Sequence, residues 1–203
     1  MTPDTFADAF NVPRETMAKL SIYAEMLSDW QTRMNLVGAA TLPHVWERHF
    51  ADSAQLLPLA PRGTTWLDIG AGAGFPGIVI ALLDPMAHLT LVESVAKKCR
   101  FLAAVVAELG LKSRITIENR RIEDLRPLAP QIITARALAS LTQLFRWGLP
   151  HAKSDTIWLL PKGARYEAEI ADAKSRFHFH HEEIPSRTSL DARIIKATGV
   201  ARI

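Results

Sequence analysis

The hydrophobic pattern changes its period near residue 65, from a helical repeat to short apolar runs. In residues 13–35 the large apolar side chains recur at alternating spacings of three and four, which places them on one face of a helix. They are Leu20, Tyr23, Leu27, Trp30 and Met34. A second helix is expected to open near residues 41–43 and to end in the proline-rich stretch at residues 56–64.

From residue 65 onward, apolar runs of strand length alternate with helix-like stretches. Strands are predicted at residues 64–70, 87–94, 113–118, 131–135 and 156–160, and helices at residues 75–83, 96–110, 138–149 and 164–175. Because the strands are apolar on both faces, the pattern predicts a parallel sheet covered by helices on both sides. Residues 176–184 and 192–200 have no helix between them and predict an antiparallel pair at one end.

These elements predict an α/β fold of Rossmann type with seven strands. We expect residues 1–64 to form a helical extension packed on a catalytic domain of residues 65–203. With 203 residues, 48% of them hydrophobic, and a mean hydropathy of +0.06, the chain can build one sizeable core. No stretch approaches the roughly 20 apolar residues that cross a bilayer, and the first residues lack the features of a signal peptide. A cytoplasmic monomer without membrane contacts is expected.

Charge is distributed unevenly along the chain. Residues 1–65 contain 5 Lys and Arg against 7 Asp and Glu, whereas the remainder contains 19 against 14. The excess of positive charge therefore accompanies the Rossmann-type region, as a polyanionic partner would require. The single cysteine, Cys99, excludes an intrachain disulfide and is expected to be a buried apolar residue.

A glycine-rich loop follows the first predicted strand, in WLDIGAGAGFPGIVIAL at residues 66–82. Gly70, Gly72, Gly74 and Gly77 satisfy both the G-x-G-x-x-G and the G-x-G-x-G patterns. Glycines let the backbone turn sharply between strand and helix and let a ligand approach the main chain. Four glycines in eight positions cost conformational entropy without adding core, so the loop predicts a ligand-binding site.

Two carboxylates and the chain length indicate which ligand. Asp68, two residues before Gly70, is expected to meet a cationic amino acid group, and it would repel a pyrophosphate. Glu93, at the end of the next strand, is placed to accept both hydroxyls of a ribose. The chain also leaves little room for the substrate domain of a dehydrogenase. S-adenosylmethionine is therefore favoured; an NAD-dependent oxidoreductase and a non-catalytic cofactor- or RNA-binding module remain as alternatives.

The motifs together resemble one family of class I S-adenosylmethionine-dependent methyltransferases. NLVGA (35–39), ERHFADS (47–53), GAGAGFPGI (70–78), RRIEDL (120–125), TARAL (134–138) and LPKG (160–163) are similar in content and order to the RsmG (GidB) family. The resemblance implies methylation of N7 of a guanine in 16S ribosomal RNA, with the RNA or the small ribosomal subunit as partner.

The resemblance also implies the cofactor-binding residues. Gly70, Phe75, Ile122, Glu123 and Arg136 correspond to positions that line the cofactor, and they join the loop residues Ala71, Gly72 and Gly74 and the two carboxylates. Ile122 and Glu123 are placed to contact the adenine edge. For Arg136, a salt bridge to Asp68 or Glu123 is a further interpretation, compatible with ligand binding.

ERHFADS contains His49, Asp52 and Ser53, which raises the possibility of a hydrolase. Helical spacing argues against a relay, because residues at these positions lie side by side on a helix, and no G-x-S-x-G motif is present. An Arg48–Asp52 pair on a solvated helix is the simplest interpretation. The resemblance instead places Arg48, His49 and Asp52 against the target base or the cofactor, as the candidate catalytic residues.

The chain contains several basic residues that are candidates for RNA binding and one histidine-rich segment. Arg48, Arg136, Lys162 and Arg165 are candidates for contact with RNA, and Lys97, Lys98 and Arg100 form a second set. In residues 176–181, RFHFHH, histidines alternate with phenylalanines as in an exposed strand, so no metal site is expected. Because N7 of guanine carries a free lone pair, methyl transfer to it needs no general base.

Overall fold

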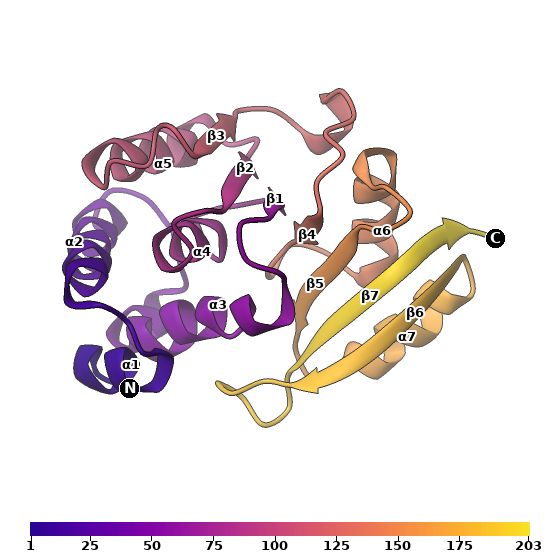
Figure 1. Cartoon of the computed structure of the whole chain (residues 1–203), viewed down its shortest axis with the longest axis horizontal. Coiled ribbons are helices and arrows are strands. Elements are labelled where there is room, and N and C mark those ends of the chain that lie inside the picture. The colour runs from indigo at the N-terminus through magenta and orange to yellow at the C-terminus, as the bar shows by residue number, and fades with distance from the viewer.

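Seven strands form a single sheet in the order β3-β2-β1-β4-β5-β7-β6, in a computed structural model that describes residues 1–203 (Figure 1). The strands are β1 (Thr65–Ile69), β2 (His88–Val92), β3 (Ile115–Glu118), β4 (Ile132–Thr134), β5 (Ile157–Lys162), β6 (Phe177–Pro185) and β7 (Arg193–Arg202). β1 to β5 are parallel, whereas β7 pairs antiparallel with both β5 and β6. The predicted parallel sheet with an antiparallel terminal pair is confirmed.

The sheet separates two apolar cores, because successive strand residues point to opposite faces. Trp66 packs into the core shared with α4 (Gly77–Leu83) and α5 (Ala96–Glu108). Leu67 packs into the core under α6 (Leu141–Gly148) and α7 (Tyr166–Lys174). The strands are thus covered on both faces, as their composition predicts. No helix is long and apolar enough to cross a membrane.

The N-terminal extension packs on the α4 and α5 side of the sheet as an additional layer (Figure 1). α2 (Arg14–Gln31) carries the predicted apolar face, with Leu20, Tyr23 and Leu27 fully buried. A shorter helix that the hydrophobic pattern does not indicate, α1 (Pro3–Phe10), begins with a capping box formed by residues 2 and 5. The Tyr23 hydroxyl donates a hydrogen bond to the main-chain oxygen of Ala73, which ties α2 to the glycine loop.

The helix predicted from residue 41 onward is wrong as a single element. The chain instead forms a 3-10 helix (η1, Ala39–His44), a π-helical turn (η2, Trp46–Ala51), a short α3 (Asp52–Ala54) and a second 3-10 turn (η3, Leu57–Leu59). Pro43 and Pro58 each lack a donor N–H, which breaks the regular pattern at both ends. The wide turn between them brings Arg48, His49 and Asp52 to one cavity.

The C-terminal hairpin has the alternation that the sequence predicts. Phe177 and Phe179 pack against Phe145 of α6, with ring centroids 5.6 and 5.0 Å apart, while His178 and His180 are exposed. A register shift lies between these two histidines. The strand is therefore held by aromatic contacts on its inner face.

Truncation of a buried side chain on α2 tests how much the packing of the N-terminal extension contributes to the stability of the protein. Leu27→Ala removes a fully buried side chain and should lower the free energy of unfolding by about 2–5 kcal/mol. Ile22→Ala, on the same helix at 37% exposure, should change it by less than about 0.5 kcal/mol. Urea unfolding followed by circular dichroism measures both; equal effects would contradict the packing of α2 on the sheet.

Candidate functional site

A cavity of about 790 Å³ lies beyond the carboxyl ends of the parallel strands, where open α/β sheets bind ligands. The loops after β1, β2, β3, β4 and β5 line it, together with residues from the N-terminal extension and from the β6–β7 connection. The predicted site residues that line this cavity are Arg48, His49, Asp52, Gly70, Ala71, Gly72, Phe75, Glu93, Ile122, Glu123, Arg136 and Lys162.

Two glycines of the loop that lines the cavity adopt backbone conformations that other residues rarely adopt. Gly70 and Gly72 have φ of +71° and +58°, in the left-handed region. A Cβ at Gly70 would lie 2.7 Å from Leu138. Gly74 differs from the prediction, because it does not line the cavity: its Cβ would lie 2.5 Å from Ile78 and 2.8 Å from the Tyr23 hydroxyl. Gly74 allows close packing beneath the loop.

The N–H groups at the start of the loop are bonded within the protein. Those of Gly70 and Ala71 donate to the main-chain oxygen of Val92 (2.8 and 3.0 Å), and that of Gly74 donates to the oxygen of Ala71 (2.7 Å). The N–H of Gly72 donates to Glu93 Oε2 at 3.0 Å. A pyrophosphate needs such groups free. The loop is therefore a poor cradle for the phosphates of a dinucleotide.

Glu93 supports the loop and faces the cavity. Its Oε2 accepts from Gly72 and its Oε1 accepts from the N–H of Val95 at 2.8 Å, which fixes the carboxylate at the end of β2. A carboxylate has about four lone-pair sites. Each oxygen therefore keeps one site for a donor in the cavity, as a pair of ribose hydroxyls requires.

Asp68 does not line the cavity, contrary to its predicted role beside the ligand. The side chain is fully buried, and its Oδ2 accepts the N–H of Gly77 at 3.0 Å, at the first turn of α4. Burial raises the pKa of Asp68 to about 7, although the hydrogen bond from Gly77 and the charge of Arg136 oppose this shift. Asp68 therefore holds the loop from beneath through Oδ2, while its Oδ1 has no hydrogen-bond partner, and its contact with a ligand stays a prediction.

Ile122 and Glu123 reach the cavity on a 3-10 turn, η4 (Ile122–Asp124). The turn is held from behind by His151, a buried residue that the sequence did not single out. His151 Nε2 lies 3.2 Å from the main-chain oxygen of Ile122, and burial lowers the pKa of the ring. The predicted adenine-contacting segment is thus fixed by a neutral histidine that donates through Nε2.

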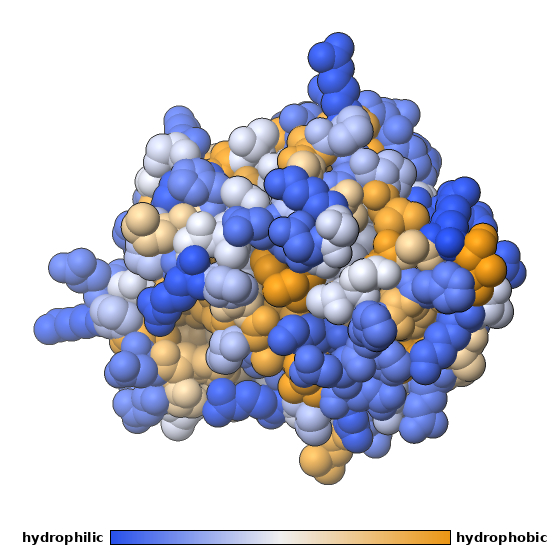
Figure 2. All heavy atoms as spheres, turned by 45° about the vertical axis from the view of Figure 1, so that its right-hand side comes forward, coloured by the Kyte–Doolittle hydropathy of each residue, from blue (hydrophilic) through white to orange (hydrophobic).

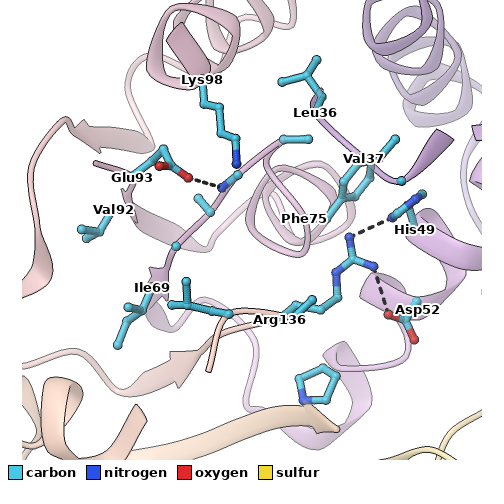
Figure 3. Close-up of a pocket in the computed structure, with 18 of the residues that line it drawn as sticks. Leu36, Val37, His49, Asp52, Ile69, Phe75, Val92, Glu93, Lys98 and Arg136 are labelled. Carbon is cyan, nitrogen blue, oxygen red and sulfur yellow. Dashed lines mark hydrogen bonds and ion pairs between the residues drawn. The ribbon is translucent and has the colours of Figure 1, made fainter. Parts of the chain in front are cut away.

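Arg136 is bound to the N-terminal extension, and not to Asp68 or Glu123 as the sequence suggested. One guanidinium nitrogen donates to the main-chain oxygen of Arg48 (3.1 Å) and to Asp52 Oδ2 (3.3 Å); the other donates to His49 Nδ1 (2.8 Å). Figure 3 shows the guanidinium of Arg136 pointing between the side chains of His49 and Asp52. Because Asp52 bonds to Arg136, the predicted Arg48–Asp52 pair is wrong.

The contacts of His49 define its tautomer. Nδ1 accepts from Arg136, so the proton is on Nε2, which donates to the Thr41 hydroxyl at 2.8 Å. The pKa of His49 is lowered to about 3, mainly by burial and in addition by the charges of Arg136 and Arg48. The ring also stacks on Phe75, 5.0 Å between centroids. Ser53 donates to the main-chain oxygen of His49, so the expected lack of a Ser–His–Asp relay is confirmed.

The predicted RNA-contacting cations occupy different environments. Arg48 is exposed at the cavity, and Lys98 of the second set also lines it, whereas Arg165 lies in a smaller adjoining hollow. Lys97 and Arg100 are exposed outside the cavity lining. Lys162 is buried, and its ammonium group donates to Glu169 (2.9 Å) and to the main-chain oxygen of Ala139 (2.5 Å). Lys162 is therefore not free to bind a phosphate, contrary to expectation.

Several cavity residues were not identified from the sequence. Arg120 and Arg121 add positive charge at the loop after β3, and Thr188, Ser189 and Ala192 contribute from near the C-terminus. Leu36 and Val37 belong to a motif that the family resemblance includes, and their N–H groups donate to the Gln31 side chain at 2.9 and 3.1 Å.

The strand order, the glycine loop after β1 and the carboxylate at the end of β2 define a class I S-adenosylmethionine-dependent methyltransferase. Solved structures with the same fold include a SAM-dependent methyltransferase from Aquifex aeolicus (TM-score 0.59, 14% identity, 78% of this chain and 94% of that one). A mutant of MtNAS in complex with S-adenosylmethionine superposes with a TM-score of 0.61 and 17% identity, over 92% of this chain and 72% of that one.

Within that class, the chain belongs to the GidB family, rRNA small subunit methyltransferase G, whose model matches residues 16–195. Ribosomal RNA small subunit methyltransferase G of Methylorubrum extorquens is 45% identical over 95% of this chain and 93% of its own length. The protein of the same name from Ruegeria pomeroyi is 39% identical, with 100% of both chains covered. The resemblance found in the sequence motifs is confirmed.

The tautomer and neutrality of His49 give a prediction about pH. The folded pKa is lowered to about 3 from 6.5, so the unfolded chain takes up the proton first, and stability should fall as pH falls from about 6.5 toward 3. Asp68, whose pKa is raised, acts with the opposite sign in an overlapping range. Comparison of wild type with His49→Gln isolates the histidine: wild type should lose stability relative to the variant as the pH is lowered.

Nitrogen-15 NMR of the imidazole provides the direct measurement. The His49 resonances should keep the pattern of the Nε2–H tautomer from pH 8 to pH 5. A titration of His49 near its ordinary pKa would contradict the buried contact with Arg136.

Proposed function

We propose that this protein transfers a methyl group from S-adenosylmethionine to N7 of a guanine in 16S ribosomal RNA, in the cytoplasm. The observation that carries the proposal is the carboxylate-supported glycine loop. The N–H groups of residues 70–72 and 74 are bonded internally, and the neighbouring Glu93 retains acceptor sites. This arrangement suits a nucleoside that bears a cationic amino acid, and it does not suit a pyrophosphate. Family membership supports the same assignment.

The residues around the cavity fit the parts of the cofactor. Glu93 would accept the ribose hydroxyls, and Ile122 and Glu123 would contact the adenine edge. The left-handed conformations of Gly70 and Gly72 leave the loop without side chains at the point of closest approach. When bound, S-adenosylmethionine supplies an activated methyl group on a sulfonium that is already an excellent leaving group.

The chain's own residues position the substrate and do not need to remove a proton. Neither ring nitrogen of His49 is free, because Nδ1 accepts from Arg136 and Nε2–H donates to Thr41. With a pKa of about 3 the ring is also a very weak base. N7 of guanine carries a lone pair, so catalysis by orientation and electrostatics is sufficient. His49 and Asp52 hold Arg136 in place, and exposed Arg48 remains available to a phosphate.

The positive charge near the cavity agrees with a nucleic-acid substrate. The cavity lining includes Arg48 from the N-terminal extension, Lys98 from the first turn of α5, and Arg120 and Arg121 from the loop after β3. Figure 2 shows apolar surface in the middle of one face of the molecule, bordered by hydrophilic side chains. Cations around a cavity that is lined in part by apolar side chains suit an unstacked base with its flanking phosphates.

Methyl transfer tests the proposal directly. The protein is incubated with methyl-labelled S-adenosylmethionine and small-subunit RNA that lacks the modification, as naked RNA and as assembled subunits. Label is expected in 7-methylguanine after digestion. Cofactor binding without transfer would support the non-catalytic alternative, and tighter calorimetric binding of NAD than of S-adenosylmethionine would support the oxidoreductase.

Substitution in the glycine loop is expected to impair activity more than substitution of His49. Gly72→Val places a β-branched residue at φ +58°, a strain of about 1–3 kcal/mol, and puts a side chain where the cofactor approaches. Its cofactor affinity should fall by about tenfold or more. His49→Gln should retain more activity, because no proton transfer is required.

Gly110→Val is the matched control for Gly72→Val. Gly110 has φ +68° and nothing within 4 Å of an added Cβ, so it shares the backbone strain without facing the cavity. The Gly110 variant should bind S-adenosylmethionine as wild type does. Loss of methylation in His49→Gln equal to that in Gly72→Val would show that His49 is indispensable.

A further inference from the structure

The connection between β6 and β7, here called the 186–192 loop, carries the most exposed large apolar side chain of the protein. Leu190 is 93% exposed, while its neighbours Thr188, Ser189 and Ala192 line the cavity. An exposed leucine is ordinary on a protein surface. This one is distinguished by its place at the border of the site.

The backbone of the 186–192 loop is tightly organised around Leu190. Arg193 donates to the main-chain oxygens of Leu190 (2.9 Å) and Ala192 (2.8 Å). The N–H of Ser186 donates to the oxygen of Ala192 (3.1 Å), and that of Ala192 donates to the oxygen of Ser189 (3.3 Å). The leucine is therefore presented by a fixed turn.

The loop is also fixed relative to the cavity. The Thr188 hydroxyl donates to Asp52 Oδ1 at 2.8 Å, and the N–H of Arg187 donates to the Gln55 side chain at 2.8 Å. The other oxygen of Asp52 accepts from Arg136. One carboxylate thus joins the loop that carries Leu190 to the arginine inside the site.

The positive charge around Leu190 is suited to RNA, which has negatively charged phosphates and flat, apolar base faces. Arg187 is exposed, with its guanidinium 5.1 Å from the ring centroid of Phe10, and Arg193 supports the turn. Arg48 is exposed at the same cavity, and Asp191 is the only acid in the loop. An apolar tip between arginines matches the alternation of phosphates and base faces along RNA.

Methylation of N7 inside a cavity requires the guanine to leave its stack. In an RNA helix N7 faces a deep, narrow groove that proteins do not enter. Enzymes that modify such bases extrude them, and apolar side chains inserted between neighbouring bases compensate for the lost stacking. Resting on the proposed function, we propose that Leu190 is this inserted side chain and fills the place of the extruded guanine.

Kinetics of Leu190→Ser test the proposal. The variant should lower kcat/KM for 16S RNA by about tenfold or more, because unstacking is no longer compensated, while calorimetric affinity for S-adenosylmethionine stays as in wild type. Leu190→Met, which keeps the apolar volume, should restore most of the rate. Met86→Ser is the control, since Met86 is 70% exposed in the turn between α4 and β2, outside the cavity lining.

Fluorescence gives a readout that a structural role of Leu190 would not change. The guanine that wild type methylates is replaced by 2-aminopurine, which brightens on unstacking. Wild type and Leu190→Met should raise the emission, and Leu190→Ser should bind the RNA with a smaller rise. The proposal would be overturned if Leu190→Ser had the kcat/KM and the emission rise of wild type. It would also be overturned if Leu190→Met lost as much of both as Leu190→Ser does. Absence of methylation by wild type would instead refute the proposed function.

Discussion

Two carboxylates hold the glycine loop in the shape that the site depends on. Asp68, at the end of β1, accepts the N–H of Gly77 beneath the loop, and Glu93, at the end of β2, accepts the N–H of Gly72 beside it. Because β1 and β2 are parallel neighbours, both acids reach the same bend from adjacent strand ends. The backbone conformation of the loop is therefore set by hydrogen bonds within the protein, one of them fully buried, before any ligand arrives.

Arg136 has a comparable role on the opposite side of the cavity. It follows β4, yet all its hydrogen-bond partners belong to the N-terminal extension, and its guanidinium lies 5.3 Å from the ring centroid of Phe75. One side chain thus joins the extension to the catalytic region around the glycine loop. The low pKa of His49 is a result of this enclosure, with burial as its largest cause.

The strands and the apolar face of α2 could be predicted because their burial follows a simple period. The irregular turns between residues 39 and 59 could not, since prolines and a π-turn override the helical pattern. Residues of the cavity could be predicted where they belong to a sequence motif, as Gly72 and Glu93 do.

The directions of the side chains could not be predicted. The Asp68 side chain lies beneath the loop, and Arg136 pairs with Asp52, which is 84 positions away in sequence, so that local spacing does not encode the contact.

The order of strands has a consequence for the synthesis of this chain. β7 follows β6 in the chain, yet it lies inside the sheet, between β5 and β6. Until it emerges from the ribosome, β5 has an open edge and β6 has no neighbour. A nascent chain that stops at the hairpin turn is left with an unpaired, aggregation-prone strand edge, so the sheet is completed only when residues 193–202 have been translated.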